Sequence, residues 1–244
     1  MPIGFETYVE GTADIQLKDS TIYFSLMAKG ILPQPVKWFN PKGSSVDIGY
    51  WWGEVTIPYG SSTDEYVTLV LTPTQFPCSI YYHTISKTTA GIKIILTCSS
   101  NNIPINYYIF STKKPLPNPS RSGLELYKEG ILVFASETPT LRPLISNANN
   151  GSGINVDTSK TVGVVCNKQG YSHSYQWSND GPGEFWYSES ENISGVLFSS
   201  KNTVSPADFI VSSVGYAYSG EDGYGERYTG NVTRSYFFID VTGI

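Results

Sequence analysis

The chain has 244 residues, enough for one or two domains that each bury a hydrophobic core. Its formal net charge is −5, which argues against a broad nucleic-acid-binding surface, because such a surface normally needs a basic face. Charged residues make up only 15% of the chain, whereas Tyr (18 residues) and Gly (23 residues) are abundant. This composition suits twisted sheets joined by many turns.

The opening of the chain is repeated just past its middle. Residues 4–11 read Gly-Phe-Glu-Thr-Tyr-Val-Glu-Gly and residues 123–130 read Gly-Leu-Glu-Leu-Tyr-Lys-Glu-Gly, with five of the eight positions identical. An alternating stretch follows each copy, at residues 12–17 and 131–135, which predicts a β-hairpin with a Glu-Gly turn in each half. The segments that close the two halves also agree: residues 105–110 and residues 233–239. The sequence therefore predicts two versions of one β-rich module.

Apolar residues alternate in many short stretches, and no window of a dozen residues keeps helical spacing without Gly, Pro or a β-branched residue. Short strands between turn residues are typical of β-sandwiches. We therefore expect an all-β fold of two tandem β-sandwich-like modules with related opening hairpins and almost no helix. The predicted strands are, in chain order, residues 21–28, 46–57, 66–71, 79–85, 91–98, 105–110, 123–127, 131–135, 161–167, 173–177, 195–198, 208–218 and 234–241.

Residues 111–122 predict the boundary between the two modules. Prolines there stiffen the chain and cannot donate to a strand ladder: Pro115, Pro117 and Pro119. We expect an N-terminal β-sandwich module at residues 1–117 and a C-terminal one at residues 118–244. Residues 146–153, which read Ser-Asn-Ala-Asn-Asn-Gly-Ser-Gly, predict a flexible surface loop.

Residues that carry chemistry are sparse. The two histidines, His83 and His173, lie in strand-like stretches without carboxylate or Cys partners at metal-ligand spacing. The three cysteines, Cys78, Cys98 and Cys166, are odd in number and widely spaced, which favours small buried side chains over a disulfide framework or a zinc site. No nucleophile elbow, phosphate loop or paired-His zinc motif occurs. We expect no enzymatic activity, no cofactor and no metal.

The sequence carries no sign of membrane insertion or export. No apolar run approaches the roughly 20 residues of a membrane helix. The amino terminus lacks the basic and apolar regions of a secretory signal. We therefore expect a protein that is soluble as made and has no Sec-type export signal.

Tryptophans form two candidate contact clusters, Trp51-Trp52 and Trp177 with Trp186. Aromatic rings stack on sugar faces and are favoured at protein interfaces. Adjacent strand residues face opposite sides of a sheet, so one of Trp51 and Trp52 is expected to face the core and the other to face outward or toward a neighbouring chain. A core position for some of these rings is the alternative.

The Gly-rich stretch 220–230 predicts an exposed loop or an interface, with Tyr218, Tyr224 and Tyr228 as contact candidates. A hairpin tip without a partner is the alternative. Its acidic residues offer oxygen ligands for calcium, but they lack the regular alternation of known calcium loops, which favours a solvated turn.

Several segments resemble a group of small proteins encoded among the tail genes of long-tailed bacteriophages and prophages of Gram-negative bacteria. The resemblance covers roughly residues 1–145. The segments that carry it are Met-Pro-Ile-Gly-Phe at 1–5, Met-Ala-Lys-Gly at 27–30, Tyr-Tyr-Ile-Phe at 107–110, Gly-Leu-Glu-Leu-Tyr at 123–127 with Gly130, and Val-Phe-Ala-Ser at 133–136. Residues beyond about 150 depart from the pattern and look like a lineage-specific extension.

The resemblance implies a non-enzymatic structural component of a bacteriophage tail tip, a minor tail protein without catalytic residues. Its implied location is the virion, after synthesis in the bacterial host cytoplasm, which agrees with the missing signal and disulfides. The implied partners are other tail-tip or tail-fibre proteins, further copies of the chain, and a host surface polysaccharide or protein. Nucleic acid and membranes are not implied.

Two other functions are compatible with the residues. A carbohydrate-binding, lectin-like β-sandwich protein would use Trp51, Trp52, Trp177 or Trp186 as a sugar platform. A secreted pore-forming or enzymatic β-protein would explain the Ser/Thr-rich strands, but the missing signal and the missing acid/base constellation count against it.

Overall fold

The computed structural model describes residues 5–7, 15–17, 24–39, 49–60, 66–112, 125–128, 131–135, 138–144, 153–168, 170–181, 184–218, 227–232 and 235–244. In the opening hairpins, and over most of residues 167–189 and 210–235, it describes the backbone. No helix occurs among the described residues, so the expected all-β class is confirmed. The strands are β1 (Phe5–Thr7), β2 (Ile15–Leu17), β3 (Ser25–Ile31), β4 (Lys37–Phe39), β5 (Tyr50–Ile57), β6 (Val67–Pro73), β7 (Cys78–Lys87), β8 (Ile92–Cys98), β9 (Ile105–Ser111), β10 (Glu125–Lys128), β11 (Ile131–Ala135), β12 (Ile154–Asn155), β13 (Val162–Lys168), β14 (Gly170–Gly181), β15 (Glu184–Ser200), β16 (Thr203–Tyr218), β17 (Arg227–Val232) and β18 (Ser235–Asp240).

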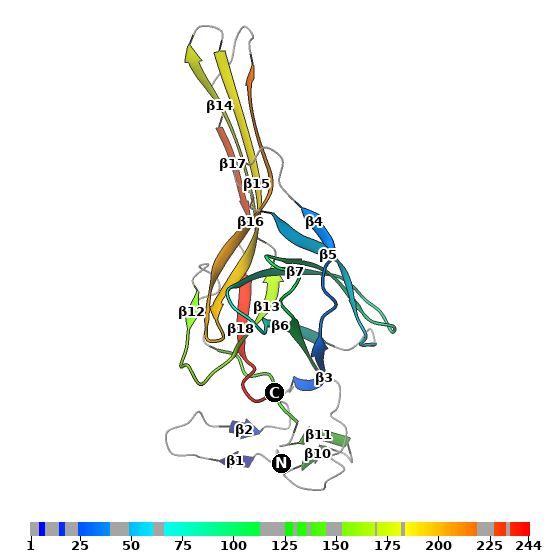
Figure 1. Ribbon diagram of the computed structural model, residues 1–244. Helices are drawn as coiled ribbons and strands as arrows, with labels where there is room; N and C mark the ends of the chain where they lie inside the picture. Colours follow the sequence, from blue (N-terminus) through cyan, green and yellow to red (C-terminus); the bar gives the residue numbers. More distant parts are fainter. Residues whose placement is uncertain are drawn as a thin grey trace.

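Two antiparallel sheets form a sandwich in the middle of the molecule (Figure 1). The five-stranded sheet has the order β18-β13-β6-β9-β3, and the nine-stranded sheet follows the path β12-β16-β15-β7-β8-β5-β4, with β14 and β17 joined to it through β15. Side chains alternate along each strand, so in β5 Val55 and Ile57 are buried whereas Glu54 and Thr56 are exposed. Each large apolar side chain buried between the sheets contributes roughly 1.5–3 kcal/mol. The main core includes Ile80, Leu96, Ile109, Val164 and Phe198.

The two halves of the chain repeat one strand topology, and each half supplies part of both sheets. In the five-stranded sheet, β18 and β13 lie on one side of the centre, and β9 and β6 lie on the other. In the nine-stranded sheet, β12, β16 and β15 occupy one side in the order in which β5, β8 and β7 occupy the other. The strand order is therefore symmetric about the β13–β6 pair and the β15–β7 pair.

Backbone hydrogen bonds also join the two halves directly. The Leu26 N–H donates to the Pro139 carbonyl, and the Leu141 N–H donates to the Phe24 carbonyl, both at 2.8 Å. The two bonds are the reciprocal pair of one antiparallel bridge, between Ser25 and Thr140. This bridge joins the start of β3, from the first half of the chain, to residues 139–141 of the second half.

Residues 139–144 also bring the two edges of the five-stranded sheet together. The Leu144 N–H donates to Phe238 of β18 at 2.8 Å, while residues 139–141 bond to the chain at the start of β3. The sheet thereby curls around a second, smaller core. The buried residues of this core are Val70, Tyr108, Phe110, Ile239 and Val241.

The arrangement differs from two tandem sandwiches divided at residues 117 and 118. Strands from before and after this point are hydrogen-bonded in the same sheets, so the halves share one sandwich and one main core. The physical reason is that central strands such as β6 and β13 are buried on both faces, against the main core on one side and the smaller core on the other. Each half alone presents apolar faces that only the strands of the other half cover.

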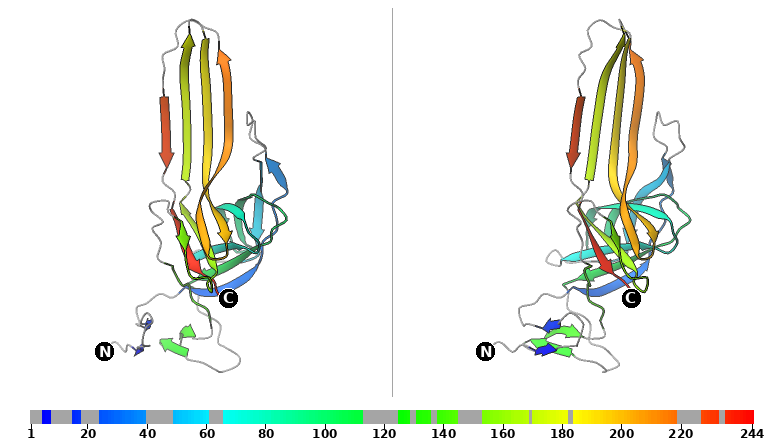
Figure 2. Two further views of the ribbon diagram at one scale, coloured as in Figure 1. Left: turned by 60° about the vertical axis from the view of Figure 1, so that its left-hand side comes forward. Right: turned by 90° about the vertical axis from the view of Figure 1, so that its left-hand side faces the viewer.

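The two opening hairpins lie at the same end of the molecule, beyond the sandwich (Figures 1 and 2). Strands β10 and β11 pair across residues 129–130, which confirms the predicted Glu-Gly hairpin. Strands β1 and β2 also pair antiparallel, but their connection is residues 8–14, which lie outside the described residues. The predicted hairpins therefore occur in both halves, with connections of different length.

A sheet of four strands projects from the opposite end of the sandwich (Figures 1 and 2). Strand β14 follows β13 of one sheet, whereas β15 and β16 extend from the other sheet. Where these strands leave the sandwich, β14 begins to pair with β15, and the pairing runs from Gly170–Ser194 to Gly181–Glu184. The four strands then form one sheet in the order β17-β14-β15-β16. We call this sheet the arm and define it as β14, β17, residues 184–193 of β15 and residues 209–218 of β16.

The junction between sandwich and arm has two local features. The pairing of β15 and β16 shifts register between Glu191 and Asn192, a β-bulge of the kind that bends and twists a strand pair. The Tyr236 hydroxyl of β18 donates a hydrogen bond to the Ser194 carbonyl of β15. This bond joins the two sheets close to the point at which their strands converge.

Candidate functional site

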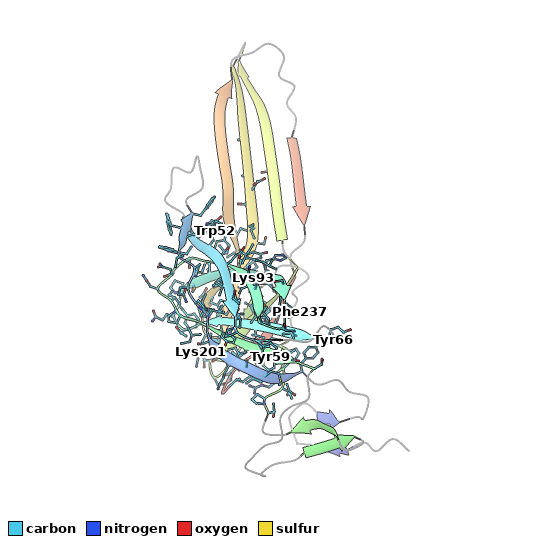
Figure 3. All side chains as sticks on the ribbon, turned by 90° about the vertical axis from the view of Figure 1, so that its right-hand side faces the viewer. Trp52, Tyr59, Tyr66, Lys93, Lys201 and Phe237 are labelled. Carbon is cyan, nitrogen blue, oxygen red and sulfur yellow. The ribbon has the colours of Figure 1, made fainter. Side chains whose placement is uncertain are left out.

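Three tryptophans gather where β4 meets β5, at the end of the sandwich from which the arm rises (Figure 3 labels Trp52). Trp38 pairs with Trp51 across the two strands, with ring centroids 5.4 Å apart and rings inclined at 61°. Trp38 is 47% exposed on this edge strand. We call Trp38, Trp51 and Trp52 the tryptophan shoulder.

Trp51 and Trp52 lie on opposite faces of β5, as strand alternation requires. Trp51 is half-buried against the main core. Trp52 is half-buried against a separate aromatic cluster, and the Lys37 ammonium lies 4.9 Å from the centre of its ring. Neither ring is fully exposed, because each packs against buried side chains on its own face of β5.

The aromatic cluster beside Trp52 ties the shoulder to the base of the arm. Tyr50 of β5, Tyr81 of β7 and Phe209 of β16 are its buried members. The Tyr50 and Phe209 rings meet edge to face with centroids 5.4 Å apart, and burial raises the pKa of Tyr50 to about 12. These rings stay neutral and function as packing groups.

Gly49 allows the Trp38 ring to lie close to the backbone. A Cβ placed on Gly49 would come 2.0 Å from the Trp38 ring, so any larger residue would displace the ring. The exposed position of Trp38 therefore depends on glycine at position 49.

The register of the arm assigns aromatic residues mainly to one face, which we call the aromatic face. Directly opposed residues of an antiparallel sheet share a face, so each paired row can be placed by register. The opposite, polar face carries mostly Ser, Thr, Asn and Gln, and the hydroxyls of Ser174 and Ser190 lie 2.8 Å apart on it. The aromatic face comprises Tyr171, His173, Tyr175, Trp177, Asn179, Phe185, Tyr187, Glu189, Glu191, Ile193, Phe209, Ser212, Val214, Tyr216, Tyr218, Tyr228, Gly230 and Val232.

The structure separates two of the predicted contact residues and brings others together. Trp177 is opposite Tyr187, and Trp186 is opposite Ser178, so Trp177 and Trp186 lie on opposite faces. The prediction that they form one aromatic cluster is wrong, because strand register decides the face. Tyr218 shares the aromatic face with Trp177.

The predicted loop at residues 220–230 is partly strand. Arg227–Val232 form β17, and Tyr228 pairs with Tyr175 of β14 on the aromatic face. Tyr224 lies outside the described residues, together with the rest of residues 219–226. Gly230 did not prevent pairing, because β14 supplies a complete partner ladder for residues 227–232.

Sequence reasoning missed Trp38, Tyr187 and Tyr216. Trp38 lies in β4, which has only three residues and gives little periodic signal. Tyr187 and Tyr216 are opposite each other and beside Trp177. The alternation of Phe, Trp and Tyr over residues 185–187 was the available signal for two faces.

The cysteines have the features of packing groups. Cys78 and Cys98 are buried and all three thiols are free. Burial raises the pKa of Cys78 to about 11 and the pKa values of Cys98 and Cys166 to about 12. The thiols are therefore protonated at neutral pH and poor nucleophiles.

Other reactive sites are sparse among the described side chains. The described residues include no cluster of three potential metal ligands, and His83 is exposed on β7. Within the same part of the chain, no helix is both long and apolar enough to span a membrane. Partly exposed aromatic side chains, such as that of Trp38, are the contact groups that this part of the chain offers.

Comparison with known proteins adds no relative. No family model matches the chain, and no curated protein or solved structure matches it.

Proposed function

We propose that this chain is a non-enzymatic structural component of a bacteriophage tail tip, which assembles with other tail proteins and contributes to host attachment. The observation that carries the proposal is the arm, which projects from a sandwich built of two repeated halves (Figure 2). By strand register, the arm has an aromatic face. The resemblance of residues 1–145 to small phage tail proteins supplies the class of particle.

The physical properties of the chain suit assembly in dilute surroundings. Aromatic residues bury large areas at low entropy cost, whereas exposed ion pairs are worth little. The aromatic face of the arm and the partly exposed Trp38 provide the first kind of contact. Free, protonated thiols are compatible with folding in bacterial cytoplasm.

The test is the composition of purified virions from a phage or prophage that encodes the chain. Mass spectrometry should detect the chain in intact particles, and antibody labelling should place it at the tail tip. Its absence from infectious particles would refute the proposal.

A variant pair then tests attachment. Virions with Trp177→Ser and Tyr218→Ser on the aromatic face should adsorb to host cells more slowly, while Ser178→Ala and Ala217→Ser on the polar face should leave adsorption unchanged. Equal adsorption of all three virions would remove the attachment role but leave a structural one.

A lectin-like carbohydrate-binding role is the second candidate, and the tryptophan shoulder favours it. Trp38 is 47% exposed beside Trp51 and offers part of its ring to a sugar. A glycan array with the purified chain tests this role, with Trp38→Ala as the binding-site variant and Glu54→Gln as the surface control. Binding that Trp38→Ala abolishes would support the lectin role.

A further inference from the structure

The arm has one face rich in aromatic residues and one face rich in polar residues. Its aromatic face carries Trp177, Phe185, Tyr187, Tyr216 and Tyr218 in the two rows nearest the tip. The paired row between them, Ser178–Trp186–Ala217, belongs to the polar face. A sheet with one apolar face is stable when another layer covers that face.

The sandwich covers only the base of the aromatic face. Phe209 and Ile193, which form the row nearest the sandwich, pack in the cluster with Tyr50 and Tyr81. Above this row, the views in Figures 1 and 2 show no described strand over either face of the arm. The aromatic face is therefore part of a packed cluster at its base, whereas no described strand covers it toward its tip.

The uncovered face is of the size of a protein interface. At a strand spacing of about 4.8 Å and a rise of about 3.3 Å per residue, a face of four strands and about ten residues measures on the order of 600 Å². A standard interface buries about 800 Å² per partner. The aromatic face approaches this value when the surface area of its projecting side chains is added to the flat area.

We infer that the aromatic face of the arm binds the aromatic face of a second copy of this chain, so that two arms pack as a β-sandwich. A flat sheet face fits another sheet face at about 10 Å separation. At its base, this face packs against residues of its own chain, among them the rings of Tyr50, Tyr81 and Trp52. Half of the residues on this face are Phe, Trp or Tyr, and its carboxylates are Glu189 and Glu191, so it offers no strong field to select an oppositely charged partner.

Self-association of the purified chain tests this inference independently of any role in a virion. Sedimentation analysis at micromolar concentration should give a dimer. The pair Tyr187→Ser and Tyr216→Ser removes opposed aromatic residues from the aromatic face. Since aromatic anchors dominate interfaces, we expect the dimer dissociation constant to rise on the order of 100-fold or more.

The matched control lies one residue away on each strand. Trp186→Ser and Ala217→Ser alter the opposed pair on the polar face and should leave the dissociation constant within a few-fold of the wild type. Circular dichroism and thermal unfolding establish that each variant is folded. A monomeric wild-type chain, or a dimer for which the aromatic-face pair has no larger effect than the polar-face pair, would overturn the inference.

A cross-linking measurement keeps the inference testable if a serine variant fails to fold. Tyr216→Cys and Ala217→Cys, each labelled with a benzophenone maleimide, place a photoreactive group on opposite faces of β16. The native thiols are protonated at neutral pH and should label slowly. Covalent dimers should form from position 216 and not from position 217, and the reverse result would also overturn the inference.

Discussion

The hairpins β7–β8 and β15–β16 occupy equivalent places in the two halves, yet only the second extends beyond the sandwich. In the first, the strands stop at the open end of the hairpin, at Cys78 and Cys98, and short connections lead from there to β6 and β9. In the second, the strands have 17 and 16 residues and β14 and β17 flank them. The comparison separates a symmetric scaffold from one asymmetric projection.

The composition changes at the point where the symmetry ends. Within the sandwich, both hairpins bury aliphatic or phenylalanine side chains, as at Ile94, Val196 and Phe198, and β7 also buries Tyr81 and Tyr82. In the arm, one face is rich in Tyr and Trp and the other in Ser. Aliphatic packing builds a permanent core, whereas Tyr and Trp are typical of surfaces that meet a partner.

The largest expected effect comes from breaking the scaffold within β15. Phe198→Ala should lower the free energy of unfolding by about 3–5 kcal/mol, because it leaves a cavity in the main core. Tyr187→Ser, further along the same strand in the arm, should change the stability of the sandwich by less than about 1 kcal/mol. Chemical denaturation of both variants measures the contrast, and equal losses would show that arm and scaffold unfold as one unit.

The next effect concerns how the two sheets are joined. The Tyr82 hydroxyl of β7 donates to the Leu69 carbonyl and accepts from the Cys166 N–H at 3.1 Å, so it links one sheet to two strands of the other. Tyr82→Phe should cost about 1–3 kcal/mol, because the buried N–H and carbonyl lose their partner. Urea denaturation midpoints measure this loss.

Tyr81 is the matched control for that substitution. It is the neighbouring buried tyrosine, and its hydroxyl has no hydrogen-bond partner among the described residues. Tyr81→Phe should therefore leave stability unchanged or raise it slightly. A loss as large as that of Tyr82→Phe would contradict the assignment of the bond between the sheets.

A smaller effect tests a place where the halves differ in chemistry. Strand β9 ends at Ser111, whereas β18 ends at Asp240, whose carboxylate accepts the Thr242 N–H at 3.0 Å. Burial would raise the pKa of Asp240, but the Thr242 hydrogen bonds and the nearby Arg142 and Lys160 charges lower it below its usual value.

A lowered pKa in the folded state means that ionised Asp240 stabilises the fold above the unfolded pKa of about 3.9, and that this contribution disappears as pH falls through the folded value. Asp240→Asn should cost about 1 kcal/mol or less at pH 7. Stability measured from pH 7 to pH 3 should show the difference from wild type shrinking below about pH 4. A difference that is constant over this range would contradict an electrostatic role.

The smallest effect is expected at the scaffold surface. Lys93 of β8 and Glu54 of β5 form an ion pair at 3.0 Å, with side chains that are 46% and 60% exposed. Glu54→Gln should change the free energy of unfolding by less than about 0.5 kcal/mol, because solvent and salt screen exposed pairs. Thermal unfolding at low and high salt measures it, and a large change would mean that the pair has a role beyond the surface.

Local patterns predicted the strands well where burial is regular. The predicted segments 91–98 and 105–110 match β8 and β9 to within one residue, because both strands are dense in buried apolar residues, with β9 buried against both cores. The long strands of the arm were underestimated: residues 173–177 and 195–198 were only parts of β14 and β15. Ser-rich stretches such as 188–194 give no apolar period and form strands because neighbouring strands supply their hydrogen bonds.

The amino-acid sequence by itself determined the all-β class, the repetition of two halves and the packing character of the cysteines, because these depend on local alternation, on matched segments and on composition. Only the tertiary structure decided that the halves share one sandwich, that Trp177 and Trp186 face opposite ways and that a shoulder forms around Trp38. Pairing between strands far apart in the chain sets these features, and a shift of one residue in register would reverse every face.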